Sequence, residues 1–157
     1  MSGVEKDGRM AYRIGRLRVH LVRDSSVPAE AKTVRGAQDA AAIARAMLEG
    51  ADREHFVVLL LNTRNGVIGV NEVSVGGLAS APVHPREVFK PAIIAGAAAV
   101  ILAHNHPSGD PTPSRDDEAI TEQVRAAGRV LGIEVLDHIV LGEPGWTSMR
   151  VDRKGGF

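Results

Sequence analysis

The sequence predicts a protein of the α/β class, of the α+β type, in which a mixed, largely antiparallel central sheet is flanked by helices. Two observations lead to this prediction. Uninterrupted apolar runs at residues 56–61 and 100–103 are typical of central strands that are buried on both faces. Three other segments place apolar residues at helical spacing, and they lie before, between and after these runs. With 157 residues, the chain is long enough to bury a substantial core in one domain.

The N-terminal part of the chain is expected to contribute one strand and one helix. We expect residues 1–12 to form a flexible lead and residues 13–157 to form a single domain. From residue 17 to residue 23, apolar side chains alternate with Arg and His, which predicts an edge strand with one solvated face. An Ala-rich helix is expected over residues 38–49, with the Gly that follows it as the C-cap.

The rest of the chain alternates strands and helices. The run at 56–61 is followed by Asn-Gly at 65–66, a strong hairpin signal, so a strand returns antiparallel from residue 67 to residue 70. Residues 72–75 either continue that strand or form a bulge. The other elements are expected as follows: a helix from 85 or 86 to about 97 that Pro91 could kink, a strand at 100–103, a helix at 114–130, a strand at 133–141 and a short strand at 146–151.

Composition and charge exclude several classes of protein. The chain has no Cys, which excludes a disulfide framework, a thiolate zinc finger and a Cys nucleophile. No apolar run approaches the roughly 20 residues of a membrane span, and the N-terminus lacks an apolar signal-peptide core, so we expect no membrane partner and a cytoplasmic location. The net charge is zero. Basic clusters at 13–23 (Arg) and 150–154 (Arg and Lys) are expected to be solvated surface, with nucleic-acid binding as the weaker alternative.

One stretch carries the chemistry. His104 and His106 follow the second apolar run, and alternate residues of an extended segment face the same way. A loop rich in Pro and Gly comes next, and Ser114 then precedes Asp117 by three residues at the start of a helix. Two imidazoles, one carboxylate and an open position describe a catalytic zinc site. Ser114 and Asp117 also have the spacing of a capping box, which is compatible with the metal site because a side chain in the first helical turn leans back toward the incoming strand.

The spacing of these four residues resembles a known metal motif. His104-x-His106, seven residues, Ser114, two residues and Asp117 is similar to the motif of the JAB/MPN (JAMM) metallopeptidase-like domains, and His-Asn-His-Pro-Ser-Gly-Asp-Pro resembles the RadC branch in particular. Three other segments share this resemblance, which covers about residues 36–149: 53–62, 83–89 and 136–142. The resemblance implies a three-layer, cytidine-deaminase-like fold. It also implies a stand-alone domain, because the preceding segment is too short for the helix-hairpin-helix region of a full-length RadC protein.

The resemblance also implies roles for individual residues. It makes the two His and Asp117 the zinc ligands, and it implies a glutamate base near the start of a central strand. Glu54 fits by position, although a polar residue at a strand entrance needs no special role; Glu72 and Glu87 are the alternatives. The hydroxyl of Ser114 could donate to an oxyanion, but helix capping competes for the same group, and the sequence does not decide between them.

Further polar residues surround the motif. Asp110 either orients a His from outside the ligand set or forms a turn. Asn105 is expected to face away from the metal and to fix the loop. His84 and His138 are expected to lie outside the set of metal ligands. Asp137 is not expected to pair with His138, because adjacent strand residues face opposite ways.

Three functions compete. The first is a zinc metallopeptidase that hydrolyses a peptide or isopeptide amide of a peptide or protein substrate. The second is a DNA-repair-associated role as a nuclease or as a DNA- or partner-binding module, which zero net charge and few aromatic residues disfavour. The third is a metal-free interaction module, which the complete metal motif disfavours. A homo-oligomer is compatible with all three.

Overall fold

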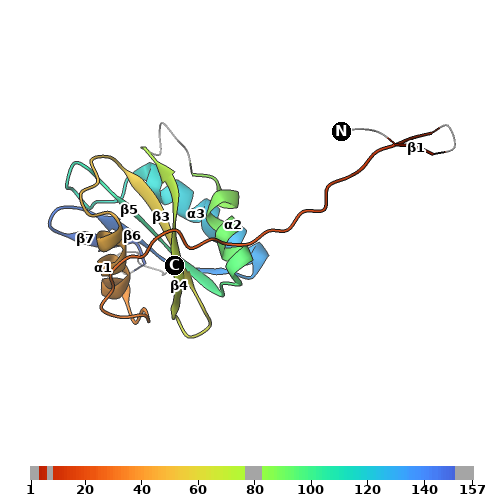
Figure 1. Cartoon of the computed structure of the whole chain (residues 1–157). Helices are drawn as coiled ribbons and strands as arrows, with labels where there is room; N and C mark the ends of the chain where they lie inside the picture. The colour runs from red at the N-terminus through yellow and green to blue at the C-terminus, as the bar shows by residue number, and fades with distance from the viewer. Residues whose placement is uncertain (1–3, 7–8, 77–82, 151–157) are drawn as a thin grey trace.

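A five-stranded mixed sheet forms the centre of the molecule (Figure 1), with the strand order β4-β3-β5-β6-β7. The computed structural model describes residues 4–6, 9–76 and 83–150. Its elements are β1 (Val4–Lys6), β2 (Arg9–Ala11), α1 (Ala37–Met47), β3 (His55–Leu61), β4 (Val67–Val75), α2 (Pro85–Ala95), β5 (Ala99–Asn105), α3 (Arg115–Leu131), β6 (Glu134–Leu141) and β7 (Trp146–Ser148). Among the described residues, no helix combines the length and apolar character needed to cross a bilayer.

The pairing of the strands confirms a mixed and largely antiparallel sheet. β3 is antiparallel to both β4 and β5, and β7 is antiparallel to β6. Only β5 and β6 run parallel among the pairs of this sheet in the described part of the chain. The carboxyl ends of β5 and β6 therefore meet at one edge of the sheet, which is where open α/β sheets commonly place ligand sites.

Helices cover both faces of the sheet and give three layers. Along β3, Val57, Leu59 and Leu61 pack in a core with α1, whereas Phe56 and Val58 belong to a second core with α2 and α3. This alternation is the period of two that an extended strand imposes on its side chains. Because both faces are covered, the strand is apolar from Phe56 to its end, as the uninterrupted run in its sequence predicted.

A tight turn and a bulge are among the irregularities of the sheet. The predicted hairpin between β3 and β4 is present, and Asn65 takes the left-handed conformation in its turn, with φ 58°. In β6, the register against β5 shifts so that Val100 faces Val135 but Ile101 faces Asp137. Leu136 is therefore an extra residue, and such a bulge reverses the faces of the residues that follow it.

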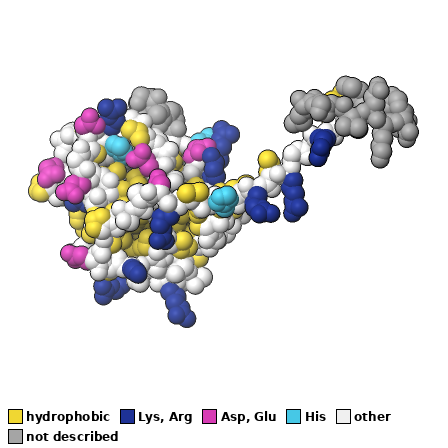
Figure 2. Space-filling model, in the orientation of Figure 1, with side chains coloured by type: hydrophobic (Ala, Val, Ile, Leu, Met, Phe, Trp, Pro, Cys, Tyr) yellow, Lys and Arg dark blue, Asp and Glu magenta, His cyan; other side chains and the backbone are white. Residues whose placement is uncertain are grey.

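The predicted strand at residues 17–23 is wrong. This segment forms no strand, and Leu17 and Val19 are 88% and 70% exposed. Figure 1 shows it within an extended stretch that leads away from the sheet, and Figure 2 shows basic side chains spaced along it. Alternation of apolar and basic residues describes side chains only, whereas a strand also needs a partner for its backbone. The edge beside the start of β4 is bridged by Thr33 instead, which pairs with Gly66.

The predicted helices and other strands are present with small shifts at their ends. The third helix begins one residue later than predicted, with Ser114 as its N-cap, and the second ends at a left-handed Gly96. The last strand is shorter than predicted, and residue 151 lies outside the described residues. β1 and β2 pair as a short hairpin within the expected lead. The flexibility of residues 1–12 and the domain boundary at residue 13 stay predictions.

Candidate metal centre

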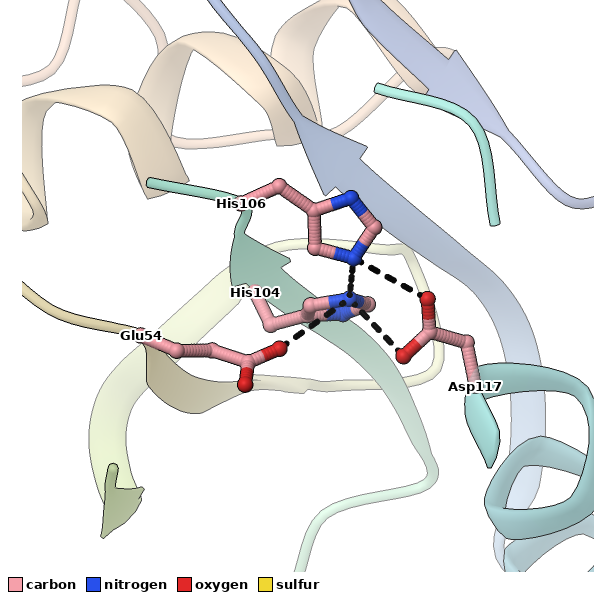
Figure 3. A group of neighbouring side chains, drawn as sticks. All are labelled: Glu54, His104, His106 and Asp117. Atoms are coloured by element: carbon pink, nitrogen blue, oxygen red, sulfur yellow. Dashed lines mark hydrogen bonds and ion pairs between the residues drawn. The ribbon is translucent and has the colours of Figure 1, made fainter. Parts of the chain in front are cut away.

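The two histidines of the motif stand at the carboxyl end of β5 and face the same side. His104 is completely buried within the strand, and His106 follows directly after it. Their Nε2 atoms lie 3.0 Å apart. Figure 3 shows both rings turned toward one point together with Glu54 and Asp117.

Asp117 and Glu54 complete this group. The carboxylate of Asp117, in the first turn of α3, lies between the rings: Oδ1 is 3.1 Å from Nε2 of His104, and Oδ2 is 3.1 Å from Nε2 of His106. Oε1 of Glu54, directly before β3, is 3.7 Å from Nε2 of His104. One ligand-type atom from each of the four residues lies within 4.8 Å of all the others.

The alternative glutamates lie in other ion pairs. Oε2 of Glu72 is 2.8 Å from Nδ1 of His55, and Oε2 of Glu87 is 2.9 Å from Nζ of Lys90. Neither belongs to the group around the two motif histidines. Of the three glutamates that the sequence offered, the structure brings only Glu54 to this site.

Asp117 caps the helix and contacts the imidazoles at the same time. The backbone N–H of Ser114 donates to Oδ2 of Asp117 (2.8 Å), and the N–H of Asp117 donates to Oγ of Ser114 (3.1 Å), which is a capping box. The two interpretations of this pair are therefore compatible. The cap fixes where the carboxylate stands before any ion arrives.

A backbone carbonyl orients His106. Nδ1 of His106 lies 2.8 Å from the carbonyl oxygen of Asp110. A carbonyl can only accept, so Nδ1 carries the proton and Nε2 of the neutral ring has a lone pair. The carboxylate of Asp110 meanwhile accepts from the N–H and hydroxyl of Thr112. Asp110 thus combines the orienting and the turn-forming roles, with different atoms for each.

Asn105 lies between the two motif histidines and ties β5 to the entrance of β3. Its Oδ1 accepts from the N–H of His55 (2.7 Å), and its Nδ2 donates to the carbonyl of Arg53 (2.9 Å). Both contacts are with the entrance of β3, and the expected role of Asn105 in fixing the loop stays a prediction. Because the two contacts bracket Glu54, Asn105 holds the backbone on either side of that glutamate.

Sequence reasoning placed His138 outside the ligand set and did not consider Thr121. Nε2 of His138 lies 2.8 Å from Nδ1 of His104, and the opposite side of the ring contacts the hydroxyl of Thr121. His138 is therefore a neighbour of a predicted ligand, outside the group of four as expected. The carboxylate of Asp137 accepts from the backbone N–H of His138 and not from its ring, which agrees with their opposite faces.

The electrostatics of the site favour a cation. Burial alone would raise the pKa of Asp117, but the hydrogen bond and charge of His104 and the N–H of Ser114 outweigh it and hold this pKa well below its usual value. An ionised carboxylate and two imidazole nitrogens then converge, and electron-rich atoms at this spacing need a proton or a metal ion between them. Zinc with Zn–N bonds of about 2.0–2.1 Å and tetrahedral geometry places its ligands about 3.3 Å apart, close to the contacts seen here.

Burial of His138 is expected to make the stability of the metal-free protein sensitive to acid. Complete burial, followed by the charge of His104, lowers the pKa of His138 well below its usual value. Below about pH 6.5 the unfolded chain therefore binds a proton that the folded chain does not, so stability falls as the pH falls. Asp117 adds a second loss only below about pH 4, where its unfolded form becomes protonated.

We therefore expect the free energy of unfolding of metal-free protein to fall between pH 7 and pH 5, by up to about 1.4 kcal/mol per pH unit from His138. Urea unfolding in the presence of a chelator measures this slope. His138→Gln should flatten it, and His20→Gln, at an exposed position, should not. Equal slopes in wild type and His138→Gln would contradict the prediction.

Comparison with known proteins agrees with the geometry. A model of the RadC-like JAB domain matches residues 34–155. A UPF0758 protein of Rubrobacter xylanophilus is 57% identical over 112 residues, which cover 71% of this chain and 49% of that protein. A UPF0758 protein of Desulforudis audaxviator is 47% identical over 145 residues, covering 92% and 60%. The chain spans about half the length of the curated relatives it matches, and a stand-alone domain stays a prediction. On this match and this site, the chain belongs to the RadC-like JAB domain family.

Proposed function

We propose that this chain is a zinc-dependent hydrolase of the JAMM type that cleaves a peptide or isopeptide amide. The observation that carries the proposal is the convergence of Glu54, His104, His106 and Asp117 within 4.8 Å in a RadC-like JAB domain. Three of these residues supply the two imidazoles and one carboxylate of a catalytic zinc site, and the fourth supplies a base.

His104, His106 and Asp117 would hold the ion. Zinc, when bound, would supply a Lewis acid that lowers the pKa of a bound water toward about 7. Glu54 takes the proton of the attacking water and passes it to the leaving nitrogen. Ser114 donates a hydrogen bond to the oxyanion. Its capping contact uses a lone pair of Oγ, because Oγ accepts from the N–H of Asp117, so the hydroxyl proton remains able to donate.

Elemental analysis of untagged protein tests the metal centre. We expect about one zinc per chain in the wild type and none in the double variant His104→Ala, His106→Ala, because two of the three ligands are then gone. His20→Ala, at an exposed position far along the sequence, should keep its zinc. A wild type that takes up no zinc, even when zinc is added at neutral pH, would reject the proposal.

A second candidate is DNA binding through the N-terminal segment. This segment is an extended stretch of chain (Figure 1). Four of its Arg residues are exposed: Arg13, Arg16, Arg18 and Arg23. If they bind phosphates, DNA affinity should fall steeply with added salt. Replacing all four by Ser should then reduce the DNA affinity. It should also reduce the slope in a plot of log affinity against log salt concentration. Fluorescence anisotropy with a labelled duplex measures both, and an unchanged slope in the variant would contradict this candidate.

A further inference from the structure

A continuous chain of buried hydrogen bonds lies behind the candidate metal centre. Nδ1 of His104 is 2.8 Å from Nε2 of His138, and Nδ1 of His138 contacts Oγ1 of Thr121. Oγ1 of Thr121 donates to the backbone carbonyl of Asp117 at 2.6 Å. His104 and His138 are fully buried and Thr121 is 1% exposed. The chain therefore starts at one residue of the metal group and ends at another.

The direction of every proton in this chain follows from its last member. The carbonyl of Asp117 can only accept, so the single hydroxyl proton of Thr121 belongs to that bond. Sδ of Met149, 3.6 Å from the same oxygen, is a weak acceptor and does not compete. Oγ1 of Thr121 is left to accept, and Nδ1 of His138 must donate to it.

A neutral imidazole has one donor and one acceptor. Because Nδ1 of His138 donates, its Nε2 has the lone pair, and Nδ1 of His104 must carry the proton between the two rings. When His104 is neutral, its Nε2 then has the lone pair that faces Asp117 and His106. The opposite tautomer of His104 would place a proton where a metal ion has to bind.

We propose that His138 and Thr121 are positioning residues of the metal centre, which fix the tautomer and orientation of His104 so that its Nε2 faces the ion. This inference rests on the proposed zinc site and extends it to two residues that do not touch the ion. His106 obtains the same tautomer from the carbonyl of Asp110. His104 obtains it from side chains of two other elements, so the geometry of the site depends on how α3 and β6 pack.

The tautomers can be read without any metal. Long-range proton–nitrogen NMR of metal-free protein labelled with nitrogen-15 at its His residues distinguishes the two neutral forms of each ring. We expect His138 to carry its proton on Nδ1, with the signals assigned by their loss in His138→Gln. A proton on Nε2 of His138 would overturn the inference, whatever the protein does with zinc.

Matched variants separate positioning from packing. Thr121→Val and His138→Phe remove hydrogen-bonding atoms but retain bulk, whereas Thr121→Ser keeps the hydroxyl and His138→Gln offers an acceptor where Nε2 stood. Competition with a chromophoric chelator should show zinc affinity about 10- to 100-fold weaker in Thr121→Val and His138→Phe. The zinc affinities of Thr121→Ser and His138→Gln should stay within about threefold of the wild-type affinity, a small change compared with that loss.

The outcomes distinguish this inference from the zinc site itself. A wild type without zinc would reject the proposed function and this role with it. A wild type with zinc, and a folded Thr121→Val that binds it equally well, would reject the inference alone. Equal losses in Thr121→Val and Thr121→Ser would also reject it, because packing would then account for both. If His138→Phe does not fold, the two Thr121 variants and the NMR measurement still decide.

Discussion

Replacing Glu54 with Gln is expected to remove most hydrolysis of a confirmed substrate while zinc stays bound. The amide has nearly the shape of the carboxylate but cannot accept the proton of the attacking water. Loss of a general base typically lowers kcat by about 10²- to 10⁴-fold. Zinc should remain, because the three proposed ligands, His104, His106 and Asp117, are unchanged in this variant.

The measurement compares kcat and zinc content in the same samples. Glu72→Gln is the matched control, because Glu72 is an acid of the neighbouring strand that pairs with His55 and lies outside the metal group. It should keep both activity and zinc. Unchanged hydrolysis in Glu54→Gln would remove the proposed base, and a loss of zinc would make Glu54 a ligand instead.

Replacing Phe56 with Ala is expected to damage the core and the metal centre together. The ring is buried and lies parallel to His104, with centroids 5.8 Å apart and an interplanar angle of 7°. Its ring centroid lies 5.3 Å from that of His138, and the two ring planes meet at 68°. Truncation of a buried Phe costs about 3–5 kcal/mol. The cavity would also remove the ring that packs against the imidazoles of His104 and His138 and restricts their orientation. Zinc affinity should therefore fall.

Phe89→Ala separates these two effects. Phe89 is equally buried in the same core, on α2, and Gly128 is among its neighbours. Its truncation should cost a similar free energy of unfolding, about 3–5 kcal/mol, but leave zinc affinity near that of wild type. Urea unfolding and chelator competition measure the two quantities. Equal zinc affinities in Phe56→Ala and Phe89→Ala would show that ring packing on His104 does not support the site.

Local patterns were enough to predict which side chains converge at the candidate metal centre. His104 and His106 share a face because they are two residues apart in an extended segment, and Asp117 points back because it lies in a first helical turn. The buried strands follow from apolar runs, and the hairpin follows from Asn-Gly. Each of these features is fixed by residues a few positions apart, so the sequence displays it directly.

Non-local features were beyond the sequence. His138 reaches His104 only because β6 runs parallel to β5 and because Leu136 is an extra residue in that pairing. Without the bulge, regular alternation from Val135 would turn the His138 ring toward α1. The wrong prediction of a strand at 17–23 also concerns a non-local feature. An alternating pattern shows which side chains would share a face, but it does not show whether another strand lies beside the backbone. In the described part of the chain, residues 17–23 form no strand.

The alternation along β5 also determines where the family can change chain length. Val100, Leu102 and His104 share one face, and Ile101 and Ala103 share the other. One residue inserted between 100 and 104 would turn the imidazole of His104 toward α1. Every β5 side chain on one side of the insertion would then face the opposite core. Insertions in the turn at 62–66 change neither face. Insertions and deletions among relatives should therefore occur in the turns, and residues 99–105 should align without gaps.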